Sequence, residues 1–147
     1  MALTGCELIV VGRHADKLAI LARRGIRTTT EIDQLATASF DIVVEATGTP
    51  GGFEAARRLV RPRGVIVLKS TYEGQAIPVN LTQIVVDEVT LIGSRCGPFE
   101  PAIRLLANKQ VDVESLIHAR YPLAEGVKAF EHAARKGTLK VIVTLQP

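Results

Sequence analysis

Four short segments carry residue types that could bind a negatively charged small molecule. Each combines glycine, hydroxyl or basic residues, and each lies at the end of a run of apolar, mostly β-branched residues. The segments are Gly12-Arg13-His14, Ala46-Thr47-Gly48, Lys69-Ser70-Thr71-Tyr72 and Ser94-Arg95-Cys96-Gly97. Guanidinium groups match phosphate oxygens, and small residues allow a ligand to approach the backbone closely. These segments are the candidate ligand site.

The apolar runs beside these segments have the length and β-branched content of buried strands. The first apolar run, residues 7–11, ends at Gly12. Similar apolar runs occur at residues 41–46, 65–68 and 89–94. Residues 27–30 fit a short edge strand, and residues 139–145 fit a strand that closes the chain. None of the apolar stretches approaches the roughly 20 residues that a membrane helix requires.

Helix signals separate the expected strands. Leu18 and Leu21 follow helical spacing, and Gly25 suits the C′ position after that helix. Thr49 can cap a second helix that has Pro50 at its first position and ends at residues 61–64. Further helices are indicated by Asn80 with Gln83, by Phe99, Ile103 and Leu106, and by Leu123, Val127, Phe130 and Ala134 before Gly137.

This alternation predicts an α/β fold with a doubly wound, mostly parallel sheet. In such sheets ligands bind outside the carboxyl ends of the strands. The four polar segments follow expected strands, so we expect them at that edge. The length of 147 residues is that of one domain.

Charge and composition exclude several classes of function. The chain has 18 Lys and Arg against 15 Asp and Glu, a net charge of +3, and only 4% aromatic residues. Nucleic-acid binding normally needs a clustered basic face with stacking aromatics, so no nucleic-acid partner is expected. No secretion signal or membrane span is indicated, and we expect a cytoplasmic protein.

Neither cysteine nor histidine spacing predicts a metal or catalytic site. Cys6 and Cys96 are far apart and form no C-x-x-C pair, so we expect free thiols. Cys96 has no neighbouring histidine that would make it a nucleophile. His14, His118 and His132 lack metal-like spacing, and His132 fits a partly exposed side chain.

The order of four segments resembles the second half of the medium-chain dehydrogenase/reductase family, the zinc-dependent alcohol dehydrogenases. The segments are IVVGRHADKLAILARRGI, DIVVEATGTPGGFEAARRLVRPRGVIVL, VTLIGSRCGP and LAEGVKAFEHAARKGTLKVIV. Together they cover nearly the whole chain. The resemblance implies a Rossmann-like fold and an NAD(P)-dependent oxidoreductase that transfers hydride between the coenzyme and an alcohol or carbonyl compound.

The resemblance gives the polar segments specific roles. Residues 46–48 correspond to the family's coenzyme-lining turn, although Gly48 also suits the turn itself. The backbone of residues 69–71 corresponds to groups that hold the nicotinamide carboxamide, and residues 94–97 to a loop on its other side. Arg95 fits a contact with substrate or phosphate and equally a surface role. Lys140 corresponds to a basic residue at the pyrophosphate and equally fits an outward-facing strand residue.

The end of the first visible strand bears on the choice of coenzyme. In dinucleotide-binding folds an acidic residue there binds the ribose 2′-hydroxyl of NAD. This chain has Gly12, followed by Arg13 and His14, and a guanidinium suits a 2′-phosphate. We therefore favour NADP(H) over NAD(H), although Arg13 also fits a solvated residue at a strand end.

Several family features are not found in these residues. The chain has no G-x-G-x-x-G loop and none of the family's catalytic zinc ligands, while residues 1–5 resemble the end of the first helix. We therefore expect residues 1–147 to be a truncated nucleotide-binding domain that lacks the first, central strand, with zinc only in the missing substrate domain. This chain alone is expected to be inactive.

The missing strand would lie between residues 7–11 and residues 41–46. Three arrangements would satisfy the open strand edges: direct pairing of the two neighbours, a strand donated by a partner chain, or membership of a longer polypeptide. The family resemblance also implies a homodimer paired through the edge strand at residues 89–94. Two other functions stay open, a non-catalytic nucleotide-binding or interaction module and a zinc-independent oxidoreductase of the quinone-reductase type.

Overall fold

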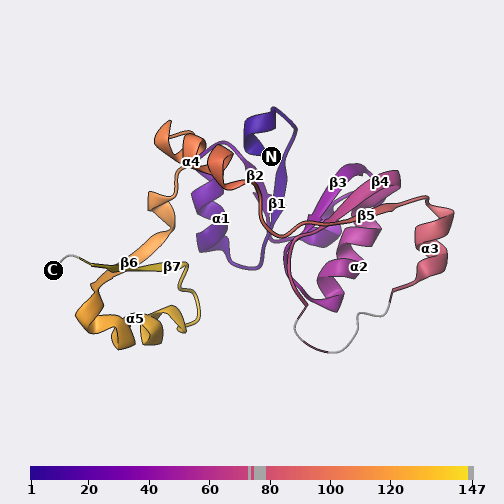
Figure 1. Ribbon diagram of the computed structural model, residues 1–147. Helices are drawn as coiled ribbons and strands as arrows, with labels where there is room; N and C mark the ends of the chain where they lie inside the picture. Colours follow the sequence, from indigo (N-terminus) through magenta and orange to yellow (C-terminus); the bar gives the residue numbers. More distant parts are fainter. Residues whose placement is uncertain (73, 75–78, 146–147) are drawn as a thin grey trace. The chain divides into compact units, whose positions relative to one another are not determined.

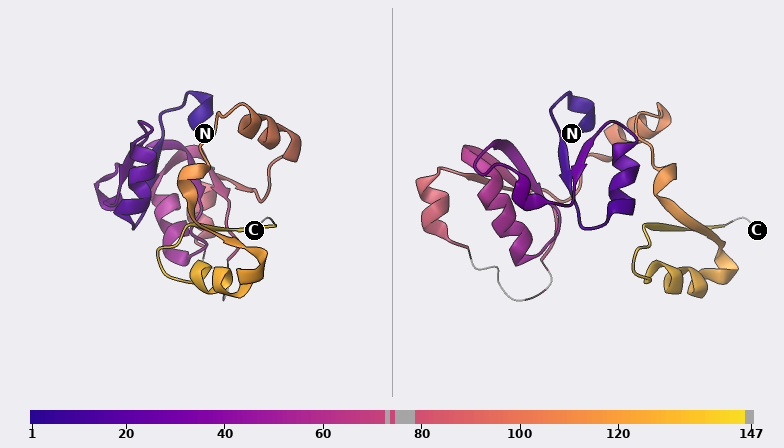
Figure 2. Two further views of the ribbon diagram at one scale, coloured as in Figure 1. Left: turned by 90° about the vertical axis from the view of Figure 1, so that its left-hand side faces the viewer. Right: turned by 180° about the vertical axis from the view of Figure 1, so that it is seen from behind.

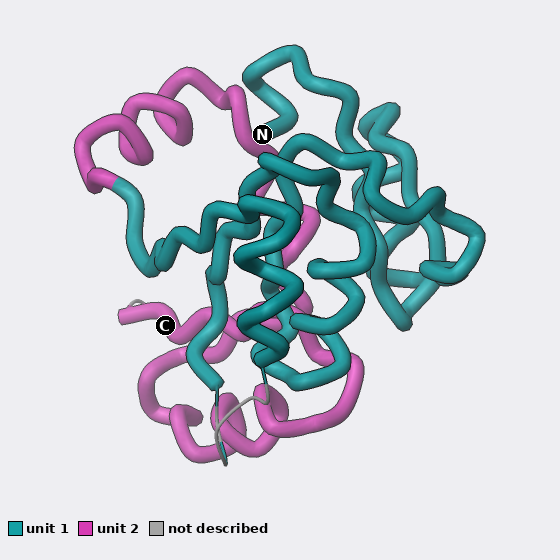
Figure 3. The backbone as a smooth tube through the Cα atoms, turned by 90° about the vertical axis from the view of Figure 1, so that its right-hand side faces the viewer, with its two compact units in different colours: residues 1–97 teal, residues 98–147 magenta. Residues whose placement is uncertain are grey.

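A computed structural model describes residues 1–72, 74 and 79–145 of the chain, which forms two compact units. Figure 3 distinguishes the first unit, Met1–Gly97, from the second, Pro98–Pro147. The first contains η1 (Ala2–Thr4), β1 (Ile9–Val11), α1 (Ala15–Ala22), β2 (Arg27–Thr29), η2 (Ile32–Gln34), β3 (Phe40–Glu45), α2 (Pro50–Leu59), β4 (Val60–Leu68), α3 (Leu81–Val86) and β5 (Thr90–Gly93). The second contains α4 (Phe99–Ala107), η3 (Glu114–Leu116), β6 (Ile117–Pro122), η4 (Leu123–Glu125), α5 (Gly126–Ala133) and β7 (Lys140–Thr144).

All strand pairs among the described residues are parallel, as expected for a Rossmann-like α/β fold. In the first unit β1 pairs with β2, and β3, β4 and β5 form a three-stranded sheet in that order. The register sets Glu45 opposite Leu68 and Leu68 opposite Gly93. The loops that follow these three strands therefore leave the sheet at one edge.

The core of the first unit lies between α2 and the three-stranded sheet (Figure 1). Ile66 of β4 is fully buried, and Ala56 and Val60 pack with it. Phe53 and Leu59 of α2 are also buried, so one face of this helix is turned away from solvent. Phe53 and Ala56 thus face the core from α2, whereas Val60 is buried there as the first residue of β4.

The second unit is a smaller βαβ arrangement. β6 and β7 pair in parallel, and α5 lies against both strands (Figure 2). Ala129 is its one buried residue among those described. No helix in the described part of the chain is long and apolar enough to cross a membrane.

The expected helix caps are present. Thr49 Oγ1 accepts a hydrogen bond from Gly52 N–H at 3.1 Å, with Pro50 as the first helical residue of α2. Asn80 Oδ1 accepts from Gln83 N–H at 3.2 Å at the start of α3. After α1, Gly25 has a φ of +75°, and its N–H donates to the Ala22 carbonyl as in a Schellman motif.

The structure differs from the expected end of the second helix. The sequence predicts that residues 61–64 end the helix, whereas α2 ends at Leu59 and β4 already begins at Val60. Val60 pairs with Phe40, and Ser39 N–H donates to the Leu59 carbonyl at 3.0 Å. Pairing with β3 therefore ends the helix at Leu59, before Pro62 and Gly64, the residues that were expected to end it.

β6 is a strand that the sequence patterns did not predict. Its partner β7 begins at Lys140, so the two strands pair across an intervening helix. Residues 7–11 and 41–46 do correspond to β1 and β3, yet these two strands do not pair with each other among the described residues. Direct closure of the gap between them, the first of the three expected arrangements, is not adopted.

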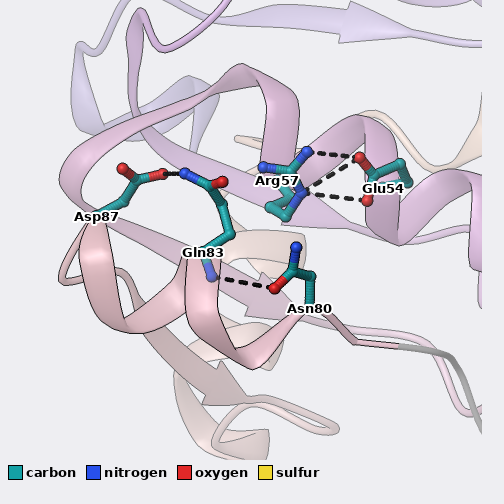
Figure 4. A network of polar contacts seen from close by, with 5 residues as sticks. All are labelled: Glu54, Arg57, Asn80, Gln83 and Asp87. Atoms are coloured by element: carbon teal, nitrogen blue, oxygen red, sulfur yellow. Dashed lines mark hydrogen bonds and ion pairs between the residues drawn. The ribbon is translucent and has the colours of Figure 1, made fainter.

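Figure 4 shows one ion pair within α2 and two hydrogen bonds at α3. Arg57 Nη2 donates to Glu54 Oε1 at 2.6 Å, and Arg57 Nε lies 3.1 Å from Glu54 Oε2. Gln83 Nε2 donates to Asp87 Oδ2 at 2.8 Å within the neighbouring α3 segment. The hydrogen bond from Arg57 lowers the pKa of Glu54 below its ordinary value, and the charge of Arg57 adds to this effect.

Replacing Arg57→Gln should raise the pKa of Glu54 toward its ordinary value, because the donor and the positive charge are both lost. A lowered pKa stabilises the fold above the ordinary carboxyl pKa, and this contribution disappears as pH falls through the lowered value. The Glu54 side chain is 62% exposed, so the contribution is below about 0.5 kcal/mol. Carbon NMR titration of the carboxyl group checks the shift. The control Arg58→Gln removes the ion pair with Asp33 instead and should leave the pKa of Glu54 unchanged. An equal shift of the Glu54 pKa in this control would contradict the role given to Arg57.

Candidate functional site

An open cavity of about 630 Å³ lies where β3, β4 and β5 end. Its lining comes from three successive strand ends: Thr47, Gly48, Thr49, Lys69, Ser70, Thr71 and Arg95. An adjoining hollow of about 300 Å³ shares Lys69, Ser70, Thr71 and Arg95. Small-molecule sites in proteins occupy about 300 to 1,000 Å³, so this cavity has the size of a ligand site.

Backbone hydrogen bonds fix the loops at this edge. Lys69 N–H donates to the Glu45 carbonyl at 2.8 Å, and Ser94 N–H donates to the Leu68 carbonyl at 2.9 Å. The Lys69 ammonium also donates to the Arg95 carbonyl. The end of β4 is thereby tied to both neighbouring strands, and the cavity walls are held in register.

The turn after β3 approaches the loop after β4 closely. Gly48 has a φ of +65°, a left-handed conformation that side chains disfavour. A Cβ built on Gly48 would lie 2.6 Å from the Thr71 carbonyl oxygen and 3.2 Å from Ser70 Cβ. Gly48 is therefore required both for the backbone angle and for the contact across the cavity.

A buried carboxyl group supports this turn from below. Glu45, the last residue of β3, is 5% exposed and is the only buried charged residue among those described. Its Oε1 accepts from Thr47 N–H at 2.6 Å, from Thr47 Oγ1–H at 2.5 Å and from Gly48 N–H at 3.1 Å. Sequence reasoning missed Glu45, whose only signal was an acidic residue ending an otherwise apolar run.

The polar character of the lining favours a negatively charged ligand. Lys69 and Arg95 supply positive charge, and hydroxyl groups of Thr47, Thr49 and Ser70 supply hydrogen-bonding capacity. None of the described lining residues carries a carboxylate. The hydroxyl groups and positive charges of the lining suit an anionic or strongly polar ligand.

The structure brings half of the predicted site residues together in one cavity. Thr47, Gly48, Lys69, Ser70, Thr71 and Arg95 all line the cavity. Ala46 and Cys96 adjoin lining residues in sequence and are exposed, and both cysteines are free thiols as expected. Their roles, like those of the lining residues, stay predictions.

The other predicted residues do not line this cavity. Gly12, Arg13 and His14 join β1 to α1, with His14 at the N-cap and both Arg13 and His14 exposed. Lys140 is the exposed first residue of β7 in the second unit. His132 is half-buried and bonded through Nδ1 to the Tyr121 hydroxyl at 2.9 Å. No group of three or more potential metal-binding side chains occurs in the described ranges.

Comparisons with known proteins match this architecture. The sequence profile described as glucose dehydrogenase C-terminus matches residues 8–145. A sorbitol dehydrogenase from Halalkalibacterium halodurans is 30% identical over 108 residues, which are 71% of this chain and 31% of that protein. The chain thus spans about a third of the length of this curated relative.

Two solved structures share the fold. One, described as a zinc-binding dehydrogenase from Sinorhizobium meliloti 1021 bound to NADP, has a TM-score of 0.85 at 21% identity and covers 97% of this chain and 47% of its own. An alcohol dehydrogenase from E. coli CFT073 complexed with NADH has a TM-score of 0.78 at 18% identity, covering 93% and 44%. At these identities the likeness establishes the fold alone.

Replacing Gly48→Ala should destabilise the first unit by about 1 to 3 kcal/mol, because the new Cβ meets a backbone carbonyl at a left-handed residue. Urea unfolding followed by circular dichroism measures the loss. Gly51→Ala is the matched control, since that glycine lies in α2 with open space around it. Equal stability of the two variants would show that the close approach is not required.

Proposed function

The chain belongs to the glucose dehydrogenase C-terminus family, the coenzyme-binding part of zinc-type medium-chain dehydrogenases, and on this premise we propose that it binds a nicotinamide coenzyme for hydride transfer. The observation that carries the proposal is the cavity at the carboxyl ends of β3, β4 and β5. Ligands of open α/β sheets bind at this edge. The close backbone contact at Gly48 and the hydroxyl groups and positive charge of the lining fit a dinucleotide.

The reaction is hydride transfer between the coenzyme and an alcohol or carbonyl compound. The bound nicotinamide supplies the hydride acceptor or donor. The residues of this chain would bind and orient it: the backbone of residues 69–71 and of residues 94–97 would hold the nicotinamide, and the turn at residues 46–48 would line the coenzyme. Zinc would polarise the substrate oxygen, and we propose that another part of the protein binds it.

The protein is proposed to extend beyond the nucleotide-binding part in residues 1–147. Among the described residues β1 pairs only with β2 and β3 only with β4, and these open strand edges support a further strand between β1 and β3. Ile42 and Val44 of β3 are 49% and 39% exposed, apolar surface that such neighbours would cover. This chain matches only 31% of the sorbitol dehydrogenase and 47% of the zinc-binding dehydrogenase, which also supports a longer protein.

A homodimer paired through β5 is proposed as the assembly. β5 pairs on one side with β4, and all four of its residues are exposed, including Leu91 and Ile92. A strand edge without charged residues can extend its sheet onto a second copy. The proposed setting is the cytoplasm.

NADP(H) is the proposed coenzyme. Gly12 directly follows β1 and stands where an acidic residue would repel a 2′-phosphate, and the next residue, Arg13, is exposed. His14 lies beside it with no side-chain cap bond. Planar guanidinium donors match phosphate oxygens, so Arg13 would discriminate between the two coenzymes.

In the complete protein, calorimetry should give tighter binding of NADPH than of NADH. Arg13→Ala should weaken NADPH binding about tenfold or more, the value of a lost charge-assisted hydrogen bond, and leave NADH binding unchanged. Arg24→Ala, an exposed arginine after α1, is the control and should change neither affinity. Equal affinity for both coenzymes in the unmodified protein would refute the preference for NADP(H).

A further inference from the structure

We propose that Glu45 is a positioning residue, which holds the turn at residues 46–49 in the shape that receives the coenzyme. The inference rests on the proposed function, because the turn matters only if the cavity binds a coenzyme. Glu45 itself is buried beneath the turn and does not line the cavity. Its effect must therefore pass through the residues that it holds.

The hydrogen bonds of Glu45 determine which groups of the turn donate and which accept. Oε1 accepts from both the backbone N–H and the hydroxyl of Thr47, and from Gly48 N–H. Since the Thr47 hydroxyl proton points to Glu45, the Thr47 oxygen is free to accept from Thr49 N–H at 3.2 Å. Thr49 Oγ1 lies 2.9 Å from Thr47 Oγ1 and caps α2. A continuous chain of bonds thus runs from the buried carboxyl group to the helix start.

Gly52 leaves the space that this network needs. A Cβ built on Gly52 would lie 1.9 Å from Thr47 Oγ1 and 2.8 Å from Glu45 Oε1. The preceding Gly51 has nothing within 4 Å of its own Cβ position. The close packing is therefore specific to the residue that faces the carboxyl group.

Removing the carboxyl group would leave donors of Thr47 and Gly48 without acceptors beneath the cavity. These hydrogen bonds are partly shielded from water, so the lost acceptor is costly and the turn would move to find other partners. Gly48 already approaches Thr71 across the cavity, and a shift of this turn changes the distance between the two walls. Coenzyme affinity should then fall even in the folded protein.

The test measures NADPH affinity by fluorescence titration in the complete protein, at a temperature where every variant is folded. Glu45→Leu should weaken NADPH binding about tenfold or more, because partly buried donors of the turn lose their acceptor. Glu45→Gln keeps an oxygen at Oε1 and should restore affinity to within about threefold of the unmodified protein. Ile66→Val, a fully buried site away from the turn, should lower thermal stability without changing affinity.

Gly52→Ala provides a second route to the same network if Glu45→Leu does not fold. It should weaken NADPH binding, whereas Gly51→Ala should not. Unchanged NADPH affinity in Glu45→Leu overturns the positioning role. If Glu45→Leu does not fold, unchanged affinity in Gly52→Ala does the same. An equal loss of affinity in Ile66→Val also overturns the positioning role. If the unmodified protein binds neither NADPH nor NADH, the proposed function itself fails and the inference falls with it.

Discussion

The parallel register of β3, β4 and β5 is the constraint on which the site depends. Because Glu45, Leu68 and Gly93 lie opposite one another, the three loops that follow leave the sheet together. A shift of one residue in either pairing would turn alternate side chains to the opposite face and separate those loops. The buried contact of Ile66 with Ala56 and Val60 fixes the register by anchoring the central strand against α2.

The same constraint explains why the cavity is polar although it stands at the end of an apolar sheet. Strand residues are paired and packed, whereas the residues just beyond the last pairing have backbone groups and side chains to offer a ligand. Lys69 illustrates this change, since its N–H continues the ladder to Glu45 while its side chain reaches the loop after β5. The sheet provides rigidity, and the loops provide chemistry.

Local signals predicted the parts of the fold that depend on local physics. Thr49, Pro50 and Asn80 act within one turn of helix, so their capping roles were readable from neighbouring residues. β6 was missed because its partner lies beyond an intervening helix, and the end of α2 was misplaced because pairing with β3 outweighed the signals at residues 61–64. Thr47, Gly48, Lys69 and Arg95 were found by their position after strands, while Glu45 escaped because burial cannot be seen in an acidic residue at a strand end.

Hydrogen exchange of the complete protein with and without NADPH tests most directly whether the cavity holds the coenzyme. Bound coenzyme should slow amide exchange at residues 46–49 and 69–71, which contribute to the lining of one cavity. Exchange in α4, outside the first unit, should be unaffected. Saturating binding of NADPH without protection of either wall would contradict the assignment of this site.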